Sequence, residues 1–168
     1  MGSEIPLQAP PLGRTRFFFE ALIGSGFFTG YLPIAPATAT SFFVLVPAYS
    51  FARVPFYWQL AVIAVVFSVG VPVATDLEKV WGHDPRRVTI DEIAGTLVTF
   101  FLNPVSLWGL GAGFFIWRFF DIVKLPFVDR SQKLAGGWGI MVDDVLAGVL
   151  ANIVLRVALM LIPVLRYH

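Results

Sequence analysis

Residues 89–117 read TIDEIAGTLVTFFLNPVSLWGLGAGFFIW, and the way this stretch folds decides the architecture of the chain. After Asp91 and Glu92 it carries no charged residue, and Asn103-Pro104 interrupts its middle. About 20 helical residues cross a bilayer, so the stretch could be one span or a hairpin of two short helices. A single span would put the acids on either side of it on opposite membrane faces. A hairpin would put them on one face.

The composition indicates a protein that lies in lipid. Of 168 residues, 57% are hydrophobic and 14% are charged, and the mean hydropathy is +0.78. A soluble domain of this size buries only about 70% of its surface and could not hide so much apolar area. Residues 54–75 and 145–165 are each long and apolar enough to cross a membrane, with Arg156 inside the second stretch facing protein or reaching toward the interface.

Charge and cysteine content exclude several classes of function. The net charge is +1, so the chain has no basic excess for nucleic acid. The absence of cysteine excludes a structural disulfide, a thiolate zinc site and a cysteine nucleophile.

The segments broken by glycine and proline predict an all-α fold, a polytopic membrane bundle with short or re-entrant hairpins. The expected elements are a helix over 16–24, a loop over 25–38, a short helix over 40–51, a helix over 55–75, a hairpin over 93–117 and a helix over 145–165. Arg53 and Asn103-Pro104 would lie at hairpin tips. The whole chain, 1–168, would be one domain, with a flexible or interfacial segment over 1–15.

Three polar islands, residues 33–41, 76–92 and 118–144, remain between the apolar stretches. The two hairpins would bring all three islands to one membrane face. That face carries most of the basic residues, namely Lys79, Arg86, Arg87, Arg118, Lys124, Arg130 and Lys133, against Arg53 and Arg166 on the other. The positive-inside rule then predicts that the islands face the cytoplasm.

Two adjacent pairs of acids precede apolar helices. Asp91-Glu92 and Asp143-Asp144 are each followed by an Ala-Gly step, which leaves room for close helix packing or for a ligand. One acid at a helix start is explained by capping, but a second is not. Acids near hydrocarbon cost about 2.5 to 3.5 kcal/mol each, so a bound cation is the economical explanation.

Arg118, Asp121 and Lys124 are spaced three residues apart, which places them on one face of a helix. They could form a salt-bridge ladder of little energetic value. Alternatively, two cations beside several carboxylates suit a phosphate group bridged to Mg²⁺.

Small residues lie beside both remaining islands. Thr38, Thr40 and Ser41 precede an apolar helix, where a hydroxyl serves as an N-cap or helps to bind an anion. Gly136, Gly137 and Gly139 precede the second acid pair, either as a turn or to let backbone N–H groups approach an anion.

These motifs resemble the phosphatidylglycerophosphatase A family of integral membrane enzymes. The matching pieces are GSG and LPIAPATATS within 24–41, HDPRRVTIDEIAG at 83–95, WRFFDIVK at 117–124 and GGWGIMVDDVLAG at 136–148. The resemblance implies removal of the terminal phosphate of phosphatidylglycerophosphate, with Mg²⁺, to give phosphatidylglycerol.

The resemblance and the residue chemistry together predict the roles of the site residues. The predicted metal-binding and catalytic residues are Asp91, Glu92, Asp121, Asp143 and Asp144, with Glu92 as a ligand or as the base that activates water. The predicted phosphate-binding residues are Arg118, Lys124, Thr38 and Ser41. The chain departs from the family pattern at Ala37, Thr40, Leu125 and Gln132.

The sequence therefore predicts a lipid phosphatase of the bacterial inner membrane whose active site faces the cytoplasm. The acyl chains of the lipid substrate would stay in the bilayer between the hairpins. The alternative is a small ion-coupled transporter, in which acids would be distributed through the depth of the bilayer. Oligomeric state and acyl preference do not follow from the sequence.

Overall fold

The computed structural model describes residues 13–83, 85–123, 128, 131 and 134–167, and in these residues the protein is all-α, as expected. The helices are α1 (Arg14–Gly24), α2 (Pro36–Phe51), α3 (Phe56–Trp81), α4 (Ile90–Phe100), α5 (Leu107–Ile122) and α7 (Gly137–Leu161), with short 3₁₀ turns at Thr29–Tyr31 and Pro163–Leu165. The segment expected to be flexible, 1–15, is described only from Gly13 onward, and α1 already begins at Arg14.

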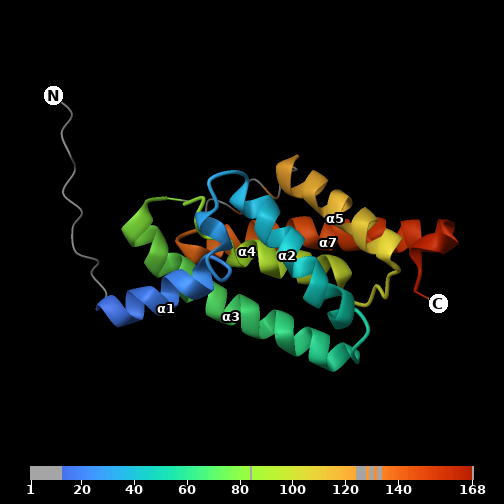
Figure 1. Cartoon of the computed structure of the whole chain (residues 1–168), viewed down its shortest axis with the longest axis horizontal. Helices are drawn as coiled ribbons and strands as arrows, with labels where there is room; N and C mark the ends of the chain where they lie inside the picture. The colour runs from blue at the N-terminus through green and yellow to red at the C-terminus, as the bar shows by residue number, and fades with distance from the viewer. Residues whose placement is uncertain (1–12, 84, 124–127, 129–130, 132–133, 168) are drawn as a thin grey trace.

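Helices α4 and α7 form the centre of the molecule, and α2, α3 and α5 pack around them (Figure 1). The central pair is close because glycines face each other across it. A Cβ at Gly148 would lie 2.6 Å from the Gly95 carbonyl oxygen, a distance that no real side chain tolerates. The expected close packing after each acid pair is therefore confirmed.

The hairpin within 93–117 is confirmed, because the chain reverses between α4 and α5. The turn is fixed by two backbone N–H groups: Leu102 donates to Gln59 Oε1 at 2.8 Å, and Ser106 donates to the Leu165 carbonyl at 2.9 Å. The other hairpin tip lies at the same end, where the Arg53 side chain approaches the Val105 carbonyl at 3.5 Å. Both tips thus lie opposite the polar islands.

Two of the described helices, α3 with 26 residues and α7 with 25, are long and apolar enough to cross a membrane. The other described helices have 11 to 16 residues and are shorter than a full span. A bundle with many spans is therefore not confirmed, although large apolar side chains are exposed on several helices, such as Val46, Trp108 and Phe115. Such a surface suits contact with lipid.

Arg156 lies inside α7. The sequence predicted that its side chain either faces protein or reaches toward the membrane interface, and in the structure the guanidinium faces protein. Its Nη2 lies 3.4 Å from the Leu102 carbonyl oxygen and 3.5 Å from that of Phe101. These carbonyls follow the C-terminus of α4, where the helix dipole favours a cation.

Candidate active site

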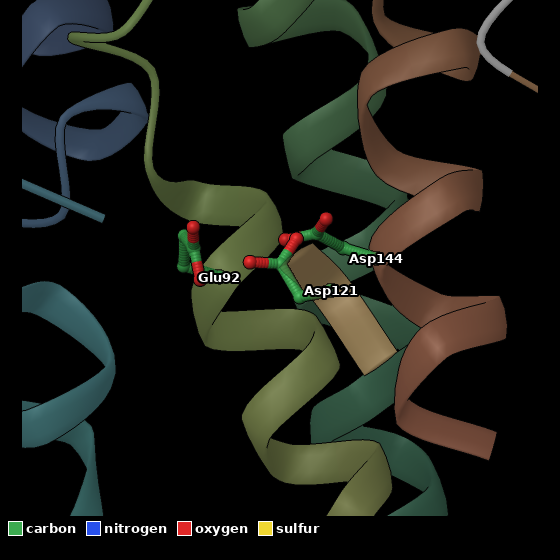
Figure 2. Close-up of side chains that lie close together, drawn as sticks. All are labelled: Glu92, Asp121 and Asp144. Carbon is green, nitrogen blue, oxygen red and sulfur yellow. The ribbon is translucent and has the colours of Figure 1, made fainter. Parts of the chain in front are cut away.

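Three carboxylates from three helices meet at the end of the molecule opposite the hairpin tips. They are Glu92 of α4, Asp121 of α5 and Asp144 of α7, and Figure 2 shows them gathered between these helices. Each offers one oxygen, and these oxygens lie within 4.8 Å of one another. Glu92 and Asp144 are 6% and 4% exposed. The sequence separated these residues by up to 52 positions, and the hairpin topology brings them together.

Close packing of α4 against its neighbours sets this geometry. At Gly95, a Cβ would lie 2.7 Å from Trp117 Nε1 and 2.9 Å from the Asp144 carbonyl oxygen. The glycine thus lets α5 and α7 approach α4 one turn beyond Glu92. The start of α7 differs from expectation: the helix begins at Gly137, so Asp144 lies two turns inside it and does not open it.

The reason for this earlier start is the glycine segment. Gly136 has φ +61°, a conformation that favours glycine, and a Cβ at Gly137 would lie 2.1 Å from the Val71 carbonyl oxygen. The Gly137 N–H donates to Thr75 Oγ1 at 2.8 Å. In the structure this segment therefore forms the turn that docks α7 onto α3. A turn was one of the two roles that the sequence predicted for these glycines.

Arg118 is paired with the carboxylates. Its Nη1 donates to Glu92 Oε2 at 2.9 Å and lies 2.8 Å from Asp121 Oδ2. The i, i+3 pair with Asp121 confirms that these two residues share a helix face. The expected third member, Lys124, follows the end of α5 at Ile122 and lies outside the described residues.

Glu92 has a second partner in the first polar island. Ser41 Oγ lies 2.9 Å from Glu92 Oε2 and 2.8 Å from the Ala37 carbonyl oxygen. Burial raises the pKa of Glu92 to about 7, although Arg118 and the hydrogen bond from Ser41 oppose the shift. A second positive charge at this position would favour the ionised carboxylate.

The cluster fits a divalent cation. Mg²⁺ binds oxygen at about 2.0–2.1 Å, so two of its ligands lie at most about 4 Å apart, and the three carboxyl oxygens, within 4.8 Å of one another, are close to that spacing. Asp144 Oδ2 is buried and has no hydrogen-bond partner among the residues that the structure describes. A buried oxygen of this kind requires a cation, a proton or a bound water.

A cavity of about 680 Å³ opens at this cluster. Its lining includes five acidic residues from α4, α5 and α7, namely Asp91, Glu92, Asp121, Asp143 and Asp144. Other parts of the lining come from the loop before α2, from the first turn of α2 and from the loop between α3 and α4. All five predicted carboxylates therefore line one cavity.

The predicted hydroxyl residues are placed differently from expectation. Helix α2 begins at Pro36 and its N-cap is Ala35, so Thr38, Thr40 and Ser41 lie inside the helix and none of them caps it. Ser41 contacts Glu92, Thr40 Oγ1 lies 2.5 Å from Thr29 Oγ1, and Thr38 is absent from the described cavity lining. The acid pair likewise does not cap α4, because its N-cap is Thr89.

Sequence reasoning missed two residues of the cavity, Arg86 and Arg87. From the sequence they had no predicted role in the site beyond membrane orientation and the motif at 83–95, yet both line the cavity together with the acids. Their position one residue before the TIDE segment was the signal that could have found them.

The chain was compared with known proteins. The family model described as Phosphatidylglycerophosphatase A matches residues 22–159. The chain belongs to the phosphatidylglycerophosphatase A family. An Escherichia coli protein named Phosphatidylglycerophosphatase A is 34% identical over 136 residues, covering 77% of each chain. No solved structure is significantly similar.

Two further relatives bear on the substrate. A Bacteroides thetaiotaomicron protein with the provisional name phosphatidylinositol-3-phosphatase is 38% identical over 149 residues, covering 84% of this chain and 94% of its own. A Haemophilus influenzae protein named Phosphatidylglycerophosphatase A is 43% identical over 75 residues, 43% of this chain and 45% of its own.

Family membership confirms an enzyme of the phosphatidylglycerophosphatase type, a phosphoric monoester hydrolase. It does not support the ion-coupled transporter. The geometry agrees, because the clustered carboxylates gather at one end of the helices and are not spread along a path through the molecule.

Proposed function

We propose that the protein removes the terminal phosphate of phosphatidylglycerophosphate in an Mg²⁺-dependent reaction. The observation that carries this proposal is the meeting of Glu92, Asp121 and Asp144 in one cavity, with Asp144 Oδ2 buried and lacking a hydrogen-bond partner in the described part of the chain. The family match supplies the substrate class.

The three clustered carboxylates would hold the ion, with Asp91 and Asp143 as further ligands, directly or through water. When bound, Mg²⁺ would neutralise phosphate oxygens and lower the pKa of a coordinated water.

The protein's own groups would orient and balance these charges. Arg118 holds Glu92 and Asp121 in place through its Nη1, so it acts on the carboxylates in this arrangement, and its predicted contact with phosphate remains a prediction. Glu92 Oε2 already accepts hydrogen bonds from Arg118 and Ser41, so if Glu92 is not itself a ligand, its other oxygen, Oε1, would accept the proton of a water. The first turn of α2 lines the cavity at Pro36 and Ala37. Proline has no backbone N–H, so of these two residues only Ala37 would present one to a phosphate.

An apolar groove suits the acyl chains. It has a volume of about 630 Å³ and lies between α2 and α3, with α4 at its base. Phe43, Trp58 and Ile93 are among its lining residues, and Ile93 directly follows Glu92 in the chain. A lipid could therefore keep its chains in the groove while its headgroup enters the acidic cavity.

The proposal includes a location in the bacterial inner membrane. Helices α3 and α7 would cross the bilayer, and the cavity end would face the cytoplasm because most basic residues lie there.

A second candidate substrate is phosphatidylinositol 3-phosphate. The provisional name of the Bacteroides thetaiotaomicron relative, at 38% identity, favours it. Both candidates are phospholipids that carry a phosphomonoester on a phosphodiester-linked headgroup.

The test is phosphate release by purified protein in neutral detergent micelles. Phosphatidylglycerophosphate, phosphatidylinositol 3-phosphate and phosphatidic acid are compared at saturating Mg²⁺, after EDTA, and after Mg²⁺ is restored. The proposal predicts release from phosphatidylglycerophosphate that stops with EDTA and returns with Mg²⁺. Equal phosphate release in EDTA would refute the Mg²⁺ dependence. Release only from another lipid would refute phosphatidylglycerophosphate as the substrate.

A further inference from the structure

The cavity is lined by charges of both signs. The five carboxylates come from helices α4, α5 and α7, whereas Arg86 and Arg87 come from the loop between α3 and α4. Both arginines are exposed, and neither forms an ion pair with any residue that the structure describes. Arg118 pairs with Glu92 and Asp121, whereas Arg86 and Arg87 have no ion-pair partner among the described residues and can meet an anion that enters from outside.

The loop that carries these arginines is held in a defined shape. The Val88 N–H donates to the Pro85 carbonyl at 2.8 Å, which closes a turn around both arginines. The next amide, that of Thr89, donates to the Gly24 carbonyl at 2.8 Å and ties the loop to the end of α1.

The backbone and side chain of Arg87 are also positioned. A Cβ at Gly30 would lie 2.2 Å from the Arg87 carbonyl oxygen, so the glycine lets the 3₁₀ turn lie directly against this loop. The guanidinium lies over two rings, 5.4 Å from the centre of Tyr31 and 5.9 Å from that of Trp81. Cation–π contacts of this kind orient the guanidinium while its N–H groups stay available.

The ligand must carry two anionic groups. A phosphomonoester would lie at the carboxylates with its cation, and a second anion of the same molecule would reach the arginines. A headgroup joined to its lipid by a phosphodiester carries such a second phosphate. Arginine suits it because its planar N–H fork matches phosphate oxygens.

We propose that Arg86 and Arg87 form a subsite for the phosphodiester phosphate of the substrate. The subsite selects lipids that carry both a phosphodiester and a phosphomonoester over lipids that carry a phosphomonoester alone. This inference rests on the proposed phosphatase function and adds its specificity.

The test compares wild type with the double variant Arg86→Gln/Arg87→Gln in neutral detergent micelles. The first measurement is kcat/KM for phosphatidylglycerophosphate. The second is inhibition by two probes: phosphatidylglycerol, which has the diester only, and inorganic phosphate, which has no diester. The matched control is Arg14→Gln, an exposed arginine of α1 that is absent from the described cavity lining.

The expected kcat/KM of the double variant is lower by roughly 10- to 100-fold, the range for losing hydrogen bonds to a charged group. Its inhibition constant for phosphatidylglycerol should rise by a similar factor, while that for inorganic phosphate stays within about twofold. Arg14→Gln should match wild type in all three measurements.

Two outcomes would overturn the inference. An unchanged inhibition constant for phosphatidylglycerol would show that the arginines do not bind the diester. An equal weakening of both probes, or the same loss in Arg14→Gln, would show a general effect of charge or folding. If wild type releases no phosphate from the lipid at all, the proposed function fails first, so the two failures are distinguishable.

Discussion

Replacing Gly95 with alanine tests whether the helix packing creates the site. The new Cβ would lie 2.7 Å from Trp117 Nε1 and 2.9 Å from the Asp144 carbonyl oxygen, whereas ordinary contacts between heavy atoms are about 3.5–4.0 Å. Helices α5 and α7 must therefore move away from α4 by roughly 0.5–1 Å. Overpacking of this kind costs about 1–3 kcal/mol, against a gain of up to about 1 kcal/mol from the better helix propensity of alanine.

With that gain subtracted, the expected net loss in the free energy of unfolding is about 0–2 kcal/mol. Activity should fall further, by roughly 10- to 100-fold, because the same movement separates Asp121 and Asp144 from Glu92. Unfolding is measured by denaturant titration in detergent micelles with tryptophan fluorescence, and activity by phosphate release.

The matched control is Gly111→Ala in α5. No atom outside its local helix lies within 4 Å of the added Cβ, so the substitution should be neutral or stabilising by up to about 1 kcal/mol. If Gly95→Ala unfolds and reacts like Gly111→Ala, the packing of α4 does not position the carboxylates, and the reasoning is refuted.

Three further predictions concern the site and the topology. Arg118→Gln should destabilise the protein by up to about 3 kcal/mol in the same denaturant titration, since it leaves Glu92 and Asp121 without their shared cation; a loss below about 0.5 kcal/mol would contradict this. Ser41→Ala removes a hydrogen bond to Glu92 and should cost about 1 kcal/mol by that measurement, with no effect arguing that the bond is absent. Cysteines at Val54 and Pro104 should label from one side of the membrane and a cysteine at His83 from the other, which the lack of native cysteine makes direct; labelling of all three from one side would refute the hairpins.

The sequence predicted the features that depend on local patterns. The interruption at Asn103-Pro104 favoured the hairpin. The Ala-Gly steps after each acid pair indicated close helix packing or room for a ligand, and the structure shows close packing of α4 against α7 there. The sequence also placed the three polar islands at one end of the molecule. The lengths of the apolar stretches between the islands indicated where the chain turns back, and therefore that the islands lie together. Residues from all three islands line one cavity, such as Pro36, Arg87 and Asp143.

Features that depend on tertiary contacts were not predictable in the same way. The early start of α7 depends on Gly137 docking on the backbone of α3, which no helical periodicity reveals. Arg118 was predicted to bind phosphate. Its spacing from Asp121 shows which face of the helix it shares, but not that Glu92 of α4 is its partner. Arg87 was taken as a marker of membrane orientation, and only the packing of Gly30 and Tyr31 shows that it lines the cavity.

Divalent-cation binding to the Asp144→Asn variant tests the central claim most directly. Mn²⁺ serves as the probe in place of Mg²⁺, and binding is measured by electron paramagnetic resonance without substrate. The control is Asp76→Asn, because Asp76 pairs with Arg16 and Lys79 and is absent from the described cavity lining. We expect Asp144→Asn to weaken Mn²⁺ binding by roughly 100-fold or more and to abolish phosphate release, and Asp76→Asn to leave both near wild type. Wild-type affinity for Mn²⁺ in folded Asp144→Asn would contradict the assignment of a metal centre to this cluster.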